Sequence, residues 1–167
     1  MTKAIYTGSA YHMAGGNIVK NKVLHFKFDT SATSTFVTLG ALNKDIKQTE
    51  EEIQRVFKRC RDNGVIANNY ISASGQEMFA VKCYAENVTM GKIFLPRFYY
   101  WLSPMVDNRK LLLGDDFIRF CDFKHAPESD IIIEDFKVDD YISFNSKINP
   151  TDCISQNEIL DMIANEQ

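Results

Sequence analysis

The stretch from Tyr70 to Val106 constrains the fold most, because strand-forming residues dominate it and turn residues interrupt it at short intervals. Ile71–Ser74 and Met78–Ala85 flank Gly75, a pattern typical of a β-hairpin with its tip near Ser74-Gly75. A second turn is predicted at residues 90–92, inside another apolar run. Short strands at such close spacing predict a mostly β fold.

Further short elements are expected on both sides of this stretch. Runs rich in strand formers predict strands over residues 23–28, 111–113, 131–133 and 141–144. Residues 35–42 are expected to end a strand and form a short helical turn, and residues 115–120 to begin a helix. Gly15-Gly16 is interpreted as a turn, because paired glycines punctuate secondary structure.

The clearest helix is predicted over residues 50–62. Thr49 and Glu52 form a capping box, in which each side chain satisfies a backbone N–H at the helix start. Apolar residues at helical spacing form one stripe, namely Ile53, Val56, Phe57 and Cys60. Ser155 and Glu158 repeat the capping pattern and predict a second helix near the C-terminus.

Composition places the chain among soluble globular proteins, with 45% hydrophobic and 25% charged residues in 167. A formal net charge of −3 gives no general attraction to nucleic acid or to an anionic membrane surface. No apolar run approaches the roughly 20 residues of a membrane span, and the N-terminus lacks the pattern of a signal peptide. We therefore expect a cytoplasmic protein without nucleic-acid or membrane partners.

Acidic residues concentrate at the C-terminus. Residues 127–167 carry ten acidic and two basic side chains, which leaves residues 1–126 with a positive balance. This step suggests a compact body over residues 1–126 and an acidic extension of mixed helix and strand over residues 127–167. A solvated acidic surface is the simpler alternative.

The four cysteines and three histidines form no metal-binding pattern. No C-x-x-C pair occurs among Cys60, Cys83, Cys121 and Cys153, and His12, His25 and His125 stand alone. We expect buried or half-buried thiols in a reducing compartment, with no metal and no cofactor.

The distinctive chemistry lies at the end of the strand over residues 23–28. Asp29 follows this strand, and Thr30, Ser31, Ala32 and Thr33 come next. Small and hydroxyl residues let the chain turn sharply, and their hydroxyl and N–H groups can hold the carboxylate. The pattern alone is equally typical of an ordinary Asx-turn or helix N-cap.

A second segment, Leu111–Ile118, runs from an apolar strand through a glycine into a helix start. Together the two segments resemble the retropepsin-like aspartic proteases, the single-domain relatives of pepsin. The resemblance covers roughly residues 20–123, with Ala73-Ser74-Gly75 in the place of the flap tip. The matching residues are Asp29, Thr30 and Ala32 in the first motif, and Leu112, Leu113, Gly114, Asp116 and Phe117 in the second.

The resemblance implies a closed acid-protease-like β-barrel over residues 1–126, with a helical insertion at about 45–64. It implies an endopeptidase in which a homodimer pairs two copies of Asp29 and uses them to activate a water against a polypeptide substrate. Thr30 would brace the paired loops, and the hairpin bearing Ala73, Ser74 and Gly75 would close over the substrate. Gly114 and Asp116 would anchor the strand-to-helix junction near the site.

Two departures from the family pattern leave alternatives open. Ser31 stands where the family usually has glycine, and the helix over residues 50–62 is additional. One alternative is a catalytically inactive relative that binds peptide or mediates assembly. Another is an unrelated β-rich structural or interaction protein in which both motifs occur by chance.

Three other patterns point to different chemistry. The glycines near residues 8–17 suggest a phosphate loop but lack the G-K-[ST] signature. The aromatic run 98–101 suggests base stacking, but a core strand or interface is favoured because basic residues are sparse around it. The acidic pairs at 115–116 and 139–140 suggest a cation site, but they fit no known loop pattern.

Overall fold

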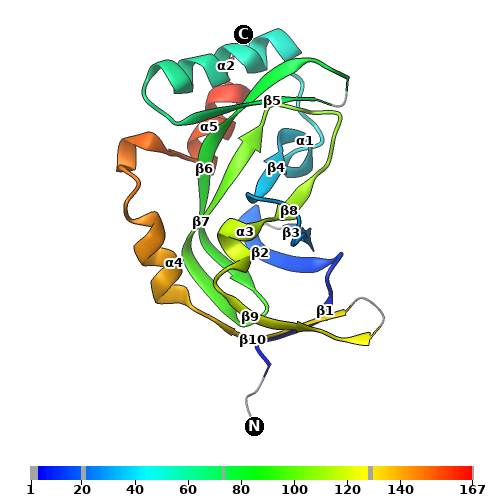
Figure 1. The fold of residues 1–167 in the computed structure, drawn as a ribbon. Helices are drawn as coiled ribbons and strands as arrows, with labels where there is room; N and C mark the ends of the chain where they lie inside the picture. Colours follow the sequence, from blue (N-terminus) through cyan, green and yellow to red (C-terminus); the bar gives the residue numbers. More distant parts are fainter. Residues whose placement is uncertain (1–3, 20–21, 73, 128–129, 167) are drawn as a thin grey trace. The chain divides into compact units, whose positions relative to one another are not determined.

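The computed structural model describes residues 4–19, 22–72, 74–127 and 130–166. The protein is mostly β, with 43% strand and 26% helix, and contains a closed six-stranded β-barrel with further strands and helices. The expected fold class is confirmed at this level, and its likeness to the acid proteases stays a prediction. Contacts divide the chain into two compact units, and strands β6 (Glu77–Met90) and β7 (Ile93–Ser103), which are labelled in Figure 1, each contribute residues to both units.

The first unit comprises Met1–Thr35, Glu86–Phe98 and Leu111–Lys147. Strand β2 (Met13–Val19) pairs antiparallel with β3 (Lys22–Phe28), and β3 pairs in parallel with β8 (Leu111–Leu113). A separate three-stranded sheet has the order β1 (Tyr6–Ser9), β10 (Asp130–Phe136), β9 (Cys121–His125). The helices of this unit are α3 (Asp115–Ile118) and α4 (Val138–Asn145).

Strand β3 shows how the sequence builds this unit. Leu24, Phe26 and Phe28 alternate with exposed residues, so one face of the strand is buried. The Phe26 ring meets Phe98 edge to face at a centroid distance of 5.6 Å. Burying each such side chain stabilises the fold by about 1.5–3 kcal/mol. The strand that leads to Asp29 is therefore firmly held.

The second unit comprises Phe36–Ala85, Tyr99–Lys110 and Ile148–Gln167. Its helices and short strands are β4 (Phe36–Thr38), α1 (Leu39–Leu42), α2 (Glu50–Asp62), β5 (Ala67–Ile71), the 3-10 helix η2 (Pro150–Asp152), β11 (Ile154–Ser155) and α5 (Gln156–Ala164). Within this unit, β5 pairs antiparallel with β6, while β4 runs parallel to β7 and β11 runs parallel to β6. The aromatic segment of β7 includes the fully buried Tyr100, in agreement with a core strand.

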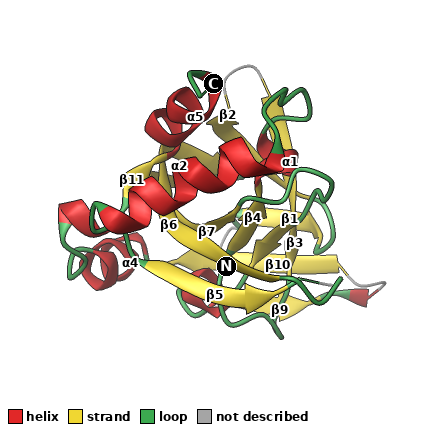
Figure 2. Cartoon of the chain, turned by 90° about the horizontal axis from the view of Figure 1, so that it is seen from above, coloured by secondary structure: helices red, strands yellow, loops and turns green. Residues whose placement is uncertain are grey.

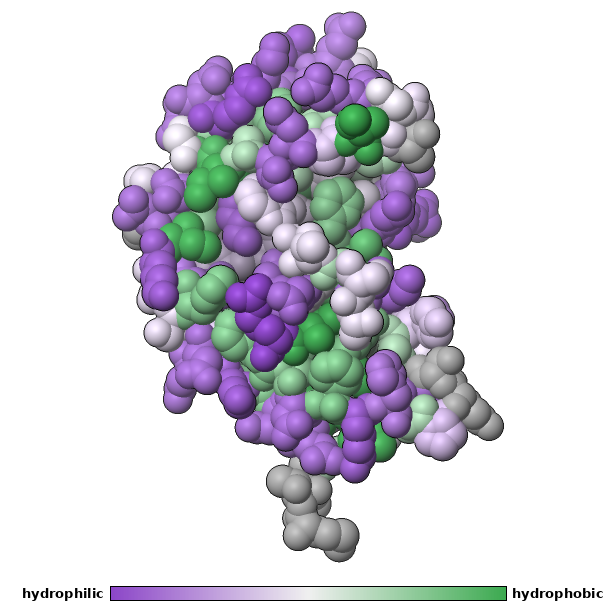
Figure 3. Space-filling view, viewed as in Figure 1, coloured by the Kyte–Doolittle hydropathy of each residue, from purple (hydrophilic) through white to green (hydrophobic). Residues whose placement is uncertain are grey.

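Helix α2 has the predicted bounds, 50–62, and both hydrogen bonds of the Thr49–Glu52 capping box are present. Its predicted stripe is buried, while hydrophilic side chains cover the region of α2 that faces solvent (Figure 3). Helix α5 lies beside α2 (Figure 2), and Glu166 beyond α5 pairs with two arginines of α2. Arg55 Nε lies 3.1 Å and Arg59 Nη2 2.5 Å from the Glu166 carboxylate.

Two sequence predictions are wrong. Residues 141–144 form part of helix α4 and not a strand: Tyr141 and Asn145 are buried one helical turn apart, and Asp139 and Asp140 lie in the first turn, where the helix dipole favours acids. Gly15-Gly16 lies inside β2 and not in a turn. A Cβ on Gly15 would lie 2.7 Å from the end of the Ile18 side chain, so the strand packs closely around this glycine.

The expected boundary near residue 126 falls within the first unit. Strand β10 pairs with β9 and β1, so the beginning of the acidic segment is part of that unit's sheet. The end of the segment, with β11 and α5, belongs to the second unit. The acidic residues therefore occur on two different parts of the fold.

Candidate active site

Asp29 directly follows β3, at the point where β3 runs parallel to β8. The backbone N–H of Asp29 donates to the carbonyl oxygen of Leu113 at 3.0 Å, so the turn begins at a fixed position on β8. The Asp29 side chain keeps 18% of its surface exposed. The carboxylate is thus held in place yet reachable, as a general acid or base must be.

Ser31 holds the Asp29 carboxylate with two hydrogen bonds. The Ser31 backbone N–H donates to Oδ1 at 3.0 Å, and the Ser31 hydroxyl donates to the same oxygen at 2.6 Å. The Ala32 N–H then donates to the Asp29 carbonyl oxygen at 3.1 Å and closes the turn. The Ser31 hydroxyl is the main reason why the pKa of Asp29 lies below its usual value, because both donors favour the ionised form.

Lys27 is a neighbour of this carboxylate that the sequence reasoning missed. Its Nζ lies 3.7 Å from Asp29 Oδ2 and 5.9 Å from the centre of the Tyr11 ring. The positive charge of Lys27 lowers the pKa of Asp29 further. Alternation along a strand places residues i and i+2 on one face, and this spacing is the signal that could have identified Lys27.

The second motif lies against the first. The Asp115 N–H donates to the carbonyl oxygen of Ala32 at 2.9 Å, which joins the start of α3 to the Asp29 turn. Asp116 Oδ1 accepts hydrogen bonds from the Thr35 N–H at 2.9 Å and from the Thr35 hydroxyl at 2.6 Å. Thr35 was also missed by the sequence reasoning, since one hydroxyl residue among several nearby carries no distinct signal.

Gly114 lies close against the backbone of the segment that follows Asp29. A Cβ at this position would lie 2.3 Å from the carbonyl carbon of Ser34 and 2.7 Å from its nitrogen. The Gly114 N–H also donates to the Thr35 hydroxyl at 3.2 Å. Only glycine allows the two backbones to come this close.

The structure gives the positions of Thr30 and of the predicted flap hairpin, and the role predicted for each of them is not tested by it. Thr30 is exposed beside Asp29, and its bracing role stays a prediction. Ser74 and Gly75 lie in the turn of the β5–β6 hairpin, where the Gly75 N–H donates to the Ser72 carbonyl oxygen at 2.9 Å. The predicted hairpin is therefore present, in the second unit. Its action as a flap stays a prediction. Ala73 lies outside the described residues.

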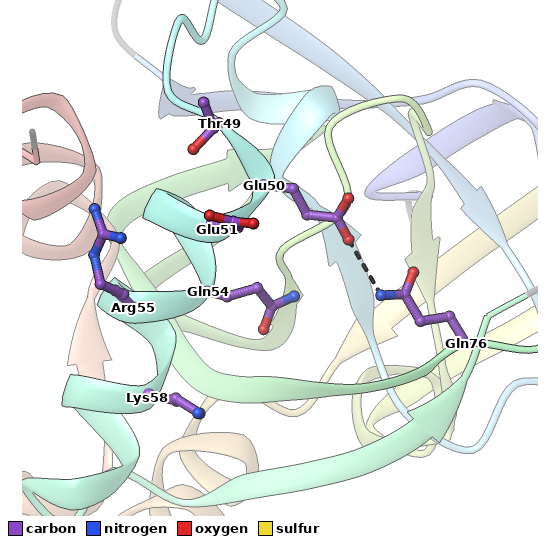
Figure 4. A pocket seen from close by; sticks show the side chains of 7 residues that line it. All are labelled: Thr49, Glu50, Glu51, Gln54, Arg55, Lys58 and Gln76. Atoms are coloured by element: carbon purple, nitrogen blue, oxygen red, sulfur yellow. Dashed lines mark hydrogen bonds between the residues drawn. The ribbon is translucent and has the colours of Figure 1, made fainter.

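Two hollows occur next to this hairpin, both formed by the second unit. A wide polar hollow of about 750 Å³ runs along α2 to Gln76 (Figure 4). A smaller cavity of about 280 Å³ lies between α2, the hairpin and residues 104–107. Glu50 lines both of them, and its Oε1 accepts a hydrogen bond from Gln76 Nε2 at 3.2 Å.

The remaining candidate groups are the acidic pair at the start of α3, the possible metal ligands and the cysteines. Asp115 forms an exposed ion pair with Arg119, with 2.7 Å between Oδ2 and Nη2. Across residues 4–19, 22–72, 74–127 and 130–166, no cluster of three or more His, Cys, Asp or Glu side chains can hold a metal ion. The four cysteines are free thiols, and burial raises the pKa of Cys83 to about 12, which makes it a poor nucleophile.

No protein-family model matches the chain, and no curated protein matches it. In the part of the chain that the structure describes, no helix is both long enough and apolar enough to span a membrane.

Proposed function

We propose that the chain is a retropepsin-like aspartic endopeptidase whose active site forms when two copies bring their Asp29 carboxylates together. The observation that carries the proposal is the junction of the two motifs. The Asp29 turn hydrogen bonds to β8 at Leu113, and the start of α3 hydrogen bonds back to that turn at Ala32. The two segments whose sequences resemble one family are therefore joined directly by backbone hydrogen bonds.

The chemistry follows from the electrostatics of paired carboxylates. One chain supplies a single half-buried Asp29 carboxylate, whose pKa is lowered by Ser31 and Lys27. When two such groups meet, one must take a proton, because like charges at hydrogen-bond distance disfavour double ionisation. The pair then titrates as a unit and shares one proton.

In the proposed reaction the ionised Asp29 acts as general base and the protonated one as general acid. The carboxylate removes a proton from a water between the pair, and the resulting hydroxide attacks the peptide carbonyl carbon. The protonated partner donates toward the carbonyl oxygen as negative charge develops there. The tetrahedral hydrate then collapses: the C–N bond breaks, and the amine leaves with the proton that the base took from the water, so no covalent intermediate with the enzyme forms. Thr30 and the β5–β6 hairpin would support the pair and cover the substrate.

A catalytically inactive peptide-binding relative is the second candidate, and the Ser31–Asp29 contact favours it. The Ser31 hydroxyl occupies one carboxylate oxygen at 2.6 Å, and Lys27 lies 3.7 Å from the other. Both stabilise the ionised form, whereas proton sharing needs one Asp29 of the pair to be neutral. The balance between these effects decides whether the pair is active.

Cleavage of a denatured protein mixture, followed by mass spectrometry at a series of pH values from acidic to neutral, tests the proposal. We expect cleavage by the wild type, none by Asp29→Asn, and a dimer in sedimentation for both proteins. Far-ultraviolet circular dichroism checks that the variant remains folded. Equal cleavage by Asp29→Asn rejects Asp29 as the catalyst. Peptide binding without cleavage at any pH supports the inactive relative.

A further inference from the structure

We propose that the cavity between α2, the β5–β6 hairpin and residues 104–107 binds the side chain of a lysine or arginine in an extended polypeptide. The cavity has a volume of about 280 Å³ and is formed by the second unit. The inference deepens the function proposed above and rests on it only for the statement that the bound polypeptide is a substrate.

Part of the cavity lining is apolar. Ile53 of α2 and Met78 of β6 are 1% and 7% exposed, and they face the cavity together with Met105 and Val106. A volume just below the roughly 300 Å³ at which small-molecule sites begin suits a single side chain. An unbranched methylene stem would pack against these walls and remove apolar surface from water.

Two carboxylates lie at the edge of the same cavity. Glu50, the first residue of α2, and Asp107, after β7, both line it and are both exposed. Among the described residues that line the cavity, none is a lysine or an arginine. The wall therefore carries negative charge with no cation of its own to balance it.

The nearest cations of α2 do not change this balance. Arg55 and Lys58 line the neighbouring polar hollow and not the cavity (Figure 4). Arg55 also hydrogen bonds to Glu166 through Nε at 3.1 Å. The negative end of the cavity therefore remains available to a positive group from outside.

An apolar floor below an acidic rim complements one class of side chain. Lysine and arginine bury an aliphatic stem along apolar surface and keep a charged head near water. Their heads would donate charge-assisted hydrogen bonds to Glu50 and Asp107. A methionine fills the same floor without the rim contacts, and a glutamate is repelled by the rim.

The backbone that carries Glu50 and Asp107 is held in place by hydrogen bonds before any ligand binds. The capping box of Thr49 and Glu52 sets the start of α2, and Gln76 holds Glu50. On the other wall, the Gly40 N–H donates to Met105 O at 2.9 Å and the Thr38 hydroxyl donates to Asn108 O at 2.6 Å, on the two sides of Asp107. Such preorganisation lowers the entropy lost on binding.

The test uses peptides that differ at one position, which holds arginine, lysine, methionine or glutamate. Binding of fluorescein-labelled peptides to Asp29→Asn protein is measured by anisotropy, and cleavage by the otherwise wild-type enzyme is measured as kcat/KM. The variants are Glu50→Gln, Asp107→Asn and both together, each compared in the two backgrounds. Glu51→Gln is the matched control, because Glu51 lies on the same turn of α2 but lines only the polar hollow.

We expect the dissociation constants of the arginine and lysine peptides to be lower than that of the methionine peptide by about tenfold or more. The double variant should reduce this preference to within about twofold while leaving the methionine peptide unchanged, and Glu51→Gln should keep the preference. Raised salt should weaken the basic peptides selectively. A preference that survives the double variant, a methionine peptide that binds as well as arginine, or no binding of any basic peptide overturns the inference.

The two proposals can fail separately. Selective binding of basic peptides without cleavage leaves this cavity assigned and rejects the protease. Cleavage that depends on Asp29 but shows no preference for a basic residue rejects the cavity assignment and leaves the protease standing.

Discussion

The Thr35 hydroxyl donates to Asp116 Oδ1 at 2.6 Å and joins two residues that are 81 positions apart in the chain. The same hydroxyl accepts from the Gly114 N–H at 3.2 Å. Thr35 is fully buried, so both bonds are shielded from water. This one side chain therefore links the segment after Asp29 to the start of α3.

Thr35→Val should lower the free energy of unfolding by about 2–3 kcal/mol, because it removes a buried donor to a carboxylate and leaves the Gly114 N–H unpaired. Thr35→Ser keeps the hydroxyl and should recover most of the loss. Urea unfolding measures both variants. Asp115→Asn, which breaks only the exposed pair with Arg119, should cost less than about 1 kcal/mol. A valine variant as stable as the wild type contradicts the assigned role.

Gly114→Ala should destabilise the protein by about 3 kcal/mol, because the added methyl group would overlap the Ser34 backbone and not a movable side chain. Thermal or urea unfolding measures the loss. Gly64→Ala is the comparison: Gly64 has φ +101° and no atom within 4 Å of an added Cβ, so only backbone strain of about 1–2 kcal/mol applies. Equal losses at both positions would show that the close approach at Gly114 has no special cost.

Ser31→Ala should raise the pKa of Asp29 toward its usual value, because the hydroxyl that donates to Oδ1 is lost while the backbone N–H remains. Carboxyl-carbon NMR titration at a dilution at which sedimentation shows a monomer measures the shift, and Ser31→Thr retains the hydroxyl as control. Since the folded pKa is lowered, Asp29 contributes stability above its unfolded pKa and loses it as pH falls through the folded pKa. The stability difference between wild type and Ser31→Ala should therefore vanish in acid.

Glu166→Gln should speed amide hydrogen exchange in α5, because the carboxylate pairs with Arg55 and Arg59 of α2. The arginines lower the pKa of Glu166, so in the wild type this contribution is present above the unfolded pKa and lost as pH falls through the folded one. Acid should thus loosen α5 in the wild type more than in the variant. Asp161→Asn, on the exposed side of α5, should leave exchange unchanged, and an equal effect there counts against the Glu166 contacts.

Local patterns predicted the elements whose signals lie within a few residues. Helix α2 and strand β8 have the predicted bounds, and the turns near residues 75 and 91 occur where expected. Capping boxes, apolar stripes and turn glycines act over one or two turns of chain, so the sequence carries them directly. The same locality explains the error over residues 141–144, where a run of strand formers is folded as helix because tertiary burial selects Tyr141 and Asn145.

For the candidate site, the local sequence is enough to predict that one aspartate follows a strand and is surrounded by hydroxyl and small residues that can hold its carboxylate. It also determined that a glycine and an acid begin a helix some 85 residues later. That Thr35 hydrogen bonds to Asp116, and that Glu50 and Asp107 line one cavity, follows from the three-dimensional packing alone. Contacts of that kind depend on which distant segments pack together, and packing is settled by the burial of the whole core and not by any local pattern.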